Sequence, residues 1–280
     1  MKRITAFILS LCMLTIFTSC GHSDKVPETT STTAVTTTQD LTVRVTFPEG
    51  YTAKQIAERL EENGVCSAKD FMALVQGQYY SSLTYRFIPG IENTENKAFV
   101  LEGYIFPDTY DFYKGESAEN ALSRFLKNTD AKLTEEYHLR ADELGFSIDE
   151  IITLASIIQE EAGDPEEMPL VSSVLHNRIK SSDYGKLQCD VTINYVNDCI
   201  IDSGYITGDT EKYKELYNTY KCDGLPAGPI CNPGIDAIKA ALYPADTNYY
   251  FFVTDKDWNY YYAETYSEHQ QNCRNVGLVG

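Results

Sequence analysis

Apolar and polar positions follow a helical spacing in several parts of the chain. The strongest pattern lies at 149–162, where apolar side chains recur every three or four positions and predict a largely buried helix. Thr52 precedes such a pattern and is predicted to cap the start of a helix that stops near Asn63. A second helix is predicted to run from Ser67. Further helices are predicted at 117–130, from about 134, at 166–181 and at 234–242.

Other segments have the pattern of strands and turns. Residues 41–46 alternate apolar and polar side chains (LTVRVT), which predicts a half-buried strand. A strand and a turn are expected within 98–113, strand-like and loop segments around 187–206, and strands at 251–253 and 259–262. Because these elements occur in mixed order, the pattern predicts an α+β fold rather than a wound parallel sheet.

The folded part is predicted to divide in two. The first strand and the two helices after it make a β-α-α module at 41–80, which is too small to bury much apolar surface alone. Residues 81–97 contain Pro89-Gly90 and several polar residues, which predict a loop or boundary. The larger mixed domain is expected at 98–280.

The N-terminal segment is predicted to direct export. Two basic residues precede an apolar run from Ile4 to Phe17, which has the length of a signal-peptide core and is short for a membrane span. Small residues then precede Cys20, an arrangement that resembles a bacterial lipobox. Residues 1–19 are therefore expected to be a lipoprotein signal peptide, with Cys20 lipidated on the extracytoplasmic face of the cell membrane. The alternative is an uncleaved short membrane anchor.

A Ser/Thr-rich tether and a strong negative charge follow. Residues 20–40 contain little to bury and are expected to be a solvated tether. The chain has 41 Asp and Glu against 23 Lys and Arg, and loss of the signal peptide would bring the formal charge from −18 to −20. Such a field repels phosphate backbones, so nucleic acid is not expected as a partner. The 21 tyrosines suit sugar binding, although buried strands also use this residue.

Six cysteines lie beyond the lipobox: Cys66, Cys189, Cys199, Cys222, Cys231 and Cys273. Six exported cysteines allow fifteen pairings, among which the local pairs Cys189–Cys199 and Cys222–Cys231 are preferred here. Free thiols are the alternative. No C-x-x-C pair occurs and the histidines are scattered, so no metal site is predicted.

One carboxylate stands out on the helix at 149–162. At ~100° per residue from Ile151, Glu161 falls at ~280° on the apolar side, whereas Glu160 falls at ~180° on the open side. A desolvated carboxyl group has a raised pKa and can remain protonated as a general acid near neutral pH. The alternative is a structural pair with a cation such as Arg178, which would lower the pKa of Glu161.

Six phrases in fixed order carry a family resemblance: LEGYIFPDTYDF (101–112), LASIIQEEAG (154–163), SSVLHNRI (172–179), LQCDVTINY (187–195), YNTY (217–220) and GLPAGPICNPGIDAIKAAL (224–242). Together they resemble the MltG-type (YceG-like) endolytic lytic transglycosylases of bacterial cell walls, firmly over 98–280 and more loosely over 41–76. The resemblance implies a LysM-like module followed by a YceG-like α+β catalytic domain. It also implies that Glu161 is the catalytic residue.

The resemblance implies a carbon–oxygen lyase that cleaves the MurNAc–GlcNAc β-1,4 bond within nascent peptidoglycan strands and leaves 1,6-anhydroMurNAc ends during cell wall assembly. Such a reaction can use the substrate's own 6-hydroxyl, so one glutamate acts first as acid and then as base without metal or cofactor. Expected partners are peptidoglycan strands and the cell-wall synthesis machinery. A non-catalytic peptidoglycan-binding lipoprotein is the alternative from another class.

Nine residues of the matching phrases are expected to bind the glycan: Glu102, Tyr104, Asp108, Asn177, Gln188, Asp190, Tyr217, Asn218 and Tyr220. The amides suit sugar hydroxyl and N-acetyl groups, and the tyrosines suit stacking on sugar rings. The three acids would supply the second carboxylate if the protein were instead a muramidase-type hydrolase. Each of the nine has a structural alternative, which for Asp190 is an ion pair with Arg178.

Two phrases depart from the family pattern. Cys189 stands where the family has Ser or Thr, and Val191 stands where it has a loop-stiffening Pro. Near the C-terminus, Tyr260 occupies a position that is commonly His, while His269 stands where a later family His falls. We therefore expect the secondary contacts of the cleft to differ from those of relatives.

Overall fold

A computed structural model describes residues 41–77 and 82–278. The predicted signal peptide, the predicted lipidation site at Cys20 and the predicted tether all lie outside the described residues. Within the described segments, no helix is long and apolar enough to cross a membrane. The described residues form one compact unit, in which the predicted module and the predicted catalytic region share a sheet.

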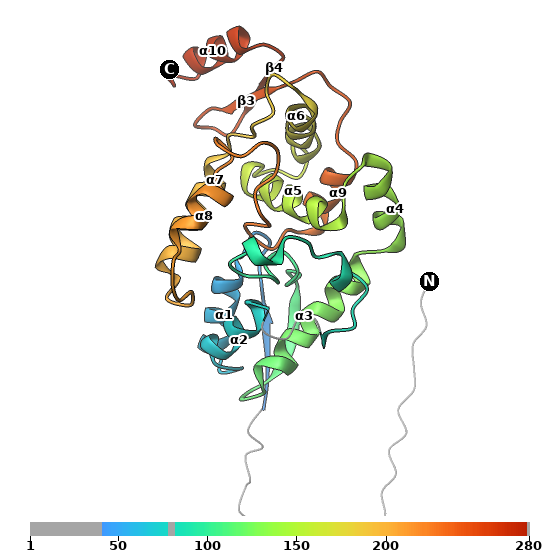
Figure 1. Ribbon diagram of the computed structural model, residues 1–280, viewed down its shortest axis with the longest axis vertical. Coiled ribbons are helices and arrows are strands. Elements are labelled where there is room, and N and C mark those ends of the chain that lie inside the picture. Colours follow the sequence, from blue (N-terminus) through green and yellow to red (C-terminus); the bar gives the residue numbers. More distant parts are fainter. Residues whose placement is uncertain (1–40, 78–81, 279–280) are drawn as a thin grey trace, which may run out of the picture. The chain divides into compact units, whose positions relative to one another are not determined.

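The fold is mixed α+β, mostly helical, with two small antiparallel sheets (Figure 1). Its elements are β1 (Thr42–Thr46), α1 (Ala53–Glu62), α2 (Ala68–Val75), β2 (Thr109–Tyr113), α3 (Ala118–Lys132), α4 (Glu135–Leu144), α5 (Ile148–Glu161), α6 (Met168–Lys180), α7 (Asp190–Tyr195), α8 (Glu211–Leu216), α9 (Ile235–Leu242), β3 (Phe251–Thr254), β4 (Tyr260–Ala263) and α10 (Tyr266–Asn275). Short 3₁₀ turns and one π-helical turn connect some of them.

Most predicted helices are confirmed, and the caps explain their starts. The Thr52 hydroxyl accepts a hydrogen bond from a backbone N–H group in the first turn of α1, as predicted, and the Ser67 hydroxyl does the same for α2. The region around 187–206 is an exception, because α7 and a π-helical turn at Val196–Ile200 replace the strand-like segments. Its β-branched residues favour strands, but burial of Thr192 and Tyr195 on one side favours the helix. Helices α8 and α10 were not predicted.

The first sheet joins segments on either side of the predicted boundary. Strand β1 pairs antiparallel with β2, with Val45 opposite Tyr110. Phe47, directly after β1, packs edge-on against Phe112 of β2 and against Phe125 of α3, with ring centroids 6.1 and 5.0 Å apart. The β-α-α segment therefore buries its apolar side against residues of the following region.

Helix α5 lies against α9 and α6 (Figure 1). Ser147 and Glu150 form a capping box at its start, and nearly all residues of its first three turns are buried. In its first turn, Asp149 pairs with buried Lys97, at 2.6 Å, and accepts a hydrogen bond from the Tyr104 hydroxyl at 2.7 Å. These contacts fix the helix whose last residue is Glu161.

All six cysteines are free thiols, so the two preferred pairs do not form. Cys189 and Cys199 lie at the two ends of the continuous helical stretch that contains α7 and the π-helical turn. Ten residues at ~1.5 Å per residue separate them by roughly 15 Å, well beyond disulfide reach. The Cys231 thiol instead donates to the buried carbonyl of Ser156, at 3.4 Å.

Candidate active site

Glu161 ends helix α5 at the wall of a cavity of about 370 Å³. Four residues predicted for the site line this cavity together: Glu161, Gln188, Asp190 and Tyr220. They come from the end of α5, from the segment that leads into α7 and from the turn after α8. Segments distant in sequence thus converge on the carboxylate selected by helical phase.

The carboxyl group of Glu161 is half-buried, and the pKa of this group is raised to about 7. Desolvation is the largest cause, and the nearby carboxylates of Asp190 and Glu160 raise the pKa further. A hydrogen bond from the Cys189 thiol acts in the opposite direction. Near neutral pH a substantial fraction of Glu161 is therefore protonated and able to donate a proton. Glu160, its neighbour, is exposed, as the helical phase predicts.

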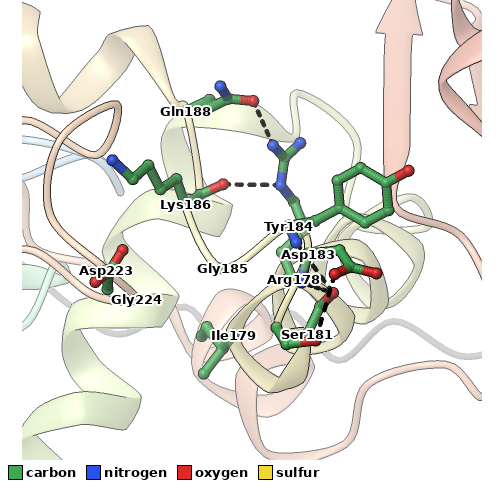
Figure 2. Close-up of a pocket in the computed structure, with 11 residues that line it drawn as sticks. Arg178, Ile179, Ser181, Asp183, Tyr184, Gly185, Lys186, Gln188, Asp223 and Gly224 are labelled. Carbon is green, nitrogen blue, oxygen red and sulfur yellow. Dashed lines mark hydrogen bonds between the residues drawn. The ribbon is translucent and has the colours of Figure 1, made fainter.

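Arg178 lines the same cavity without pairing with Glu161. Its Nε donates to the carbonyl of Lys186 at 2.9 Å and its Nη2 donates to Gln188 Oε1 (Figure 2). Its Nη1 donates to the carbonyl of Tyr250 at 3.3 Å. The structural alternative for Glu161, an ion pair with Arg178, is therefore not what the structure shows. The guanidinium instead fixes the Gln188 side chain.

Gln188 has left-handed backbone geometry, with φ of 58°. A non-glycine residue in this region is strained and persists only where the surroundings hold it. Here the backbone N–H of Gln188 donates to the carbonyl of Thr219 at 3.0 Å, and the N–H of Cys189 donates to the Thr219 hydroxyl at 2.9 Å. These bonds tie the segment before α7 to the turn after α8. No sequence pattern indicated this strain.

Of the three candidate second carboxylates, Asp190 is the one that lines the cavity. It accepts a hydrogen bond from the Tyr220 hydroxyl at 2.7 Å, and its predicted ion pair with Arg178 is not formed. Asp108 lies elsewhere, exposed before β2, and accepts a hydrogen bond from Asn128.

Glu102 is completely enclosed and does not line the cavity. Its Oε1 accepts hydrogen bonds from the Ala53 N–H at 2.9 Å and from Asn232 Nδ2 at 2.8 Å, while Oε2 accepts one from the Tyr195 hydroxyl at 3.1 Å. Desolvation raises the pKa of Glu102 to about 7, against the effect of these donors. It joins the start of α1 to α7, so the expected contact with glycan is replaced by a structural role.

Two of the predicted tyrosines lie in the core. Tyr104 is fully buried, stacks on Phe87 with centroids 5.0 Å apart, and donates its hydroxyl to Asp149. Tyr217 is 1% exposed and packs against Tyr195, with centroids 5.6 Å apart. Neither ring can stack on a sugar, so the structural alternative holds for both.

Two predicted amides brace loops rather than line the cavity. Asn177 Nδ2 donates to the carbonyls of Thr247 and Tyr249, each at 2.9 Å. Asn218 Oδ1 accepts from the backbone N–H of Tyr220 at 2.9 Å, which shapes the turn that carries this tyrosine. Asn177 therefore holds the loop before β3, and Asn218 holds the turn of Tyr220, and neither lines the cavity.

The C-terminal segment completes the cavity, which the sequence analysis did not predict. Phe251 and Phe252 of β3, together with Tyr266 and His269 of α10, line it. Tyr260 of β4 lies just outside; its hydroxyl donates to the Glu161 carbonyl at 3.0 Å and accepts from the Gly163 N–H at 3.1 Å. The family-pattern comparison of Tyr260 and His269 was the signal that pointed toward this segment.

Two further cavities share walls with the one that holds Glu161. One, of about 220 Å³, is lined by Glu160 and shares Val191 with it. The other, of about 600 Å³, shares Arg178 and Gln188 with it (Figure 2). The Glu161 cavity therefore adjoins both of the others, which share no lining residue with each other. The described residues contain no group of three or more His, Cys, Asp or Glu side chains arranged to hold a metal ion.

Comparisons with known proteins place this geometry in context. The model of the YceG-like family matches residues 24–275. The chain is 30% identical over 238 residues to an endolytic murein transglycosylase of Bacillus subtilis, covering 81% of this chain and 63% of that protein. A Streptococcus pneumoniae protein of the same name is 26% identical over 242 residues, covering 81% of this chain and 43% of that protein. The chain thus spans less than two thirds of the length of these curated relatives.

A solved structure is also similar. The crystal structure of a YceG-like protein from Listeria monocytogenes aligns with a TM-score of 0.68 and 30% sequence identity. The alignment covers 82% of this chain and 75% of that one. The mixed, mainly helical fold is therefore shared with this protein.

Proposed function

The chain belongs to the YceG-like family, and from this premise we propose that it is an endolytic lytic transglycosylase. Its substrate is the peptidoglycan strand, which it cleaves internally at the MurNAc–GlcNAc β-1,4 bond. The product keeps a 1,6-anhydroMurNAc end. The names of the distant relatives, endolytic murein transglycosylases, support this substrate and reaction.

The observation that carries the proposal is the position of Glu161 in a cavity that adjoins both of the others. A strand cut at its end can be bound in a cleft that is closed beyond the terminal unit. A strand cut internally continues in both directions and needs room beyond the acid on both sides. The cavity beside Glu160 and the cavity beyond Arg178 supply room on either side of the acid, which supports internal cleavage.

The chemistry follows from a glutamate with a pKa near 7. Protonated Glu161 donates its proton to the glycosidic oxygen as the bond from this oxygen to C1 of MurNAc breaks. The resulting carboxylate then accepts the proton of the 6-hydroxyl, whose oxygen forms the new bond to C1. The second step restores protonated Glu161, and no water is consumed.

A second candidate is a muramidase-type hydrolase. Asp190 favours it, because this acid lines the cavity with Glu161 and could act on a water or on C1. Its hydrogen bond from Tyr220 would then position the carboxylate. The end group of the product separates the two reactions, since hydrolysis leaves a reducing end.

The test is to incubate the purified chain with uncrosslinked glycan strands and identify the ends by mass spectrometry. We expect anhydro ends from the wild-type protein and a loss of at least a thousandfold in rate for Glu161→Gln, which keeps the shape of the side chain. Reducing ends that disappear in Asp190→Asn would assign the hydrolase. Binding without any product would leave a non-catalytic peptidoglycan-binding protein.

We also propose that the protein acts from the extracytoplasmic face of the cell membrane, anchored through lipid on Cys20, near the cell-wall synthesis machinery. The supporting feature is the lipobox-like sequence after the apolar run. Metabolic labelling with a fatty acid tests this, with Cys20→Ser as the variant that should lose the label. A labelled Cys20→Ser variant would remove the proposal.

A further inference from the structure

The largest of the three cavities is a polar groove beside the catalytic one. Figure 2 shows it between the loop after α6 and the segment at Asp223-Gly224. Its walls are connected, because the Gly224 N–H donates to the carbonyl of Gly185 at 2.8 Å. Arg178 and Gln188 line both this groove and the Glu161 cavity. The groove therefore adjoins the space in which a sugar beside Glu161 would lie, close to any group attached to that sugar.

The side chains of the groove carry both signs of charge. Lys186 supplies an ammonium group, while Asp183 and Asp223 supply carboxylates. All three are exposed, and no ion pair within the described part of the chain involves any of them. Their charges are thus available to a ligand that brings its own cation and anions.

This pattern fits a peptide better than a sugar. A neutral sugar ring is usually held by an aromatic face and by amide or hydroxyl groups. Only Tyr184 offers a ring in this groove, and that ring packs against Tyr250 and Phe251, with centroids 5.2 Å from each. The part of peptidoglycan that carries both carboxylates and an amine is the stem peptide, which is attached to the muramyl sugar.

We infer that this groove binds the stem peptide of the muramyl residue at the scissile bond, with Lys186 pairing with a peptide carboxylate and Asp223 with a peptide amine. The inference rests on the proposed function for the identity of the polymer. Its consequence is a preference for strands that still carry peptides over strands from which an amidase has removed them.

Lys186 suits a test because its structural role uses only its backbone. The carbonyl of Lys186 accepts the bond from Arg178, and this bond is kept in Lys186→Ala. Lys127 on α3 provides the matched control, since it is exposed, lies outside the three cavities and has no ion pair within the described residues. Thermal unfolding of both variants checks that the fold is retained.

The experiment measures kcat/KM for anhydro-end formation on peptide-bearing strands and on amidase-treated strands. We expect the wild-type protein and Lys127→Ala to prefer peptide-bearing strands, and Lys186→Ala to lose about fivefold of this preference, as expected for one solvent-accessible charge pair. If Lys186→Ala left the ratio of kcat/KM on peptide-bearing strands to kcat/KM on amidase-treated strands unchanged, the inference would be overturned.

Binding of a fluorescent muramyl tetrapeptide separates failure of the site from failure of the proposed function. Anisotropy titrations of Glu161→Gln, with and without Lys186→Ala, report the site without any reaction. Weaker binding in the double variant together with no anhydro product from wild type would keep the peptide site and remove the transglycosylase. Equal binding in both variants would remove the peptide site whatever the products are.

Discussion

At the scale of single residues, the role proposed for Glu161 predicts that activity depends on pH. The proposed first step needs the protonated acid, and the pKa of Glu161 is raised to about 7 chiefly by desolvation. We therefore expect kcat/KM to fall above about pH 7, approaching ~10-fold per pH unit. Initial rates of anhydro-end formation between pH 5 and 9 measure this decline, which is the alkaline limb of the pH–rate profile. A decline centred near pH 4.5, the ordinary value for glutamate, would contradict the raised pKa of Glu161.

Cys189 provides a finer test of the same limb. Its thiol donates to Glu161 and so favours the charged carboxylate, which lowers the pKa of Glu161. Removing this donor in Cys189→Ala should move the decline to higher pH, and only slightly, because a thiol is a weak donor. Cys189→Ser restores a hydroxyl donor and should leave the limb near the wild-type position. A downward shift in Cys189→Ala would contradict this account.

Glu102 makes stability, rather than activity, depend on pH. The pKa of this buried group is about 7 in the folded chain against an ordinary 4.5, so the folded state holds a proton that the unfolded state has released. The free energy of unfolding should therefore fall as pH rises from about 4.5 to 7, with Glu102 contributing on the order of 3 kcal/mol. Urea unfolding across this range measures the slope.

Glu102→Gln is the matched variant for this measurement. The amide oxygen can still accept from Ala53 and Asn232, while the amide nitrogen can donate to the Tyr195 hydroxyl. The part of the slope due to Glu102 should disappear, and the part due to Glu161 should remain. An unchanged slope in Glu102→Gln would show that Glu102 does not take up the proton.

The sequence predicted the partial burial of Glu161 better than it predicted the positions of the residues around it. Helical phase alone indicated which of two adjacent glutamates lies on the apolar side, because the regular geometry of α5 determines that direction. The side chains of Tyr104 and Tyr217 gave no such indication. A tyrosine suits a cleft and a core equally well, and only the tertiary packing decides between them.

At the scale of elements, helix α5 depends on a buried ion pair at its start. The Lys97 ammonium, with 0% of its side chain exposed, donates to both carboxylate oxygens of Asp149, at 2.6 and 2.7 Å. Lys97→Met would leave this carboxylate buried without its partner, which typically costs about 3–5 kcal/mol. We expect the midpoint of guanidinium unfolding to fall accordingly.

Lys97→Met with Asp149→Asn is the control, because it removes the uncompensated charge. Tyr104 can still donate to the amide oxygen of Asn at position 149, so part of the lost stability should return. A double variant as unstable as Lys97→Met would mean that packing around Lys97, rather than the charge pair, stabilises the start of α5.

Several helix starts were predictable from a capping side chain and the apolar pattern after it. Thr52 caps α1 as predicted, and Ser67 marks the start of α2. Thr265 also caps a helix, α10, but no apolar pattern follows it to indicate that helix. The segment at α7 was not predictable in this way, because Cys189 makes no capping hydrogen bond with its side chain and β-branched residues follow. Its helical form depends on contacts with residues far away in the sequence.

At the scale of the whole molecule, the segment at 41–77 and the rest of the described chain share one hydrophobic core. The alternating pattern of β1 predicted a strand, but a pattern cannot name the strand that pairs with it. Its partner β2 lies more than sixty residues later, with Arg44 opposite Asp111. A boundary drawn from local loop signals therefore could not reveal this shared core.

The shared core predicts that the segment after the boundary does not fold stably alone. A fragment of residues 81–280 lacks β1, α1 and α2, and so it exposes Phe112 and Phe125, which the full chain buries to 1 and 0% exposure. Apolar surface of this kind favours aggregation. We expect a chain of residues 41–280 to unfold in one cooperative transition, and the fragment to aggregate in size-exclusion chromatography or to show no such transition. Restored solubility on coexpression with residues 41–80 would support the shared core, whereas a fragment that unfolds cooperatively and forms anhydro ends would show that the module is an independent domain.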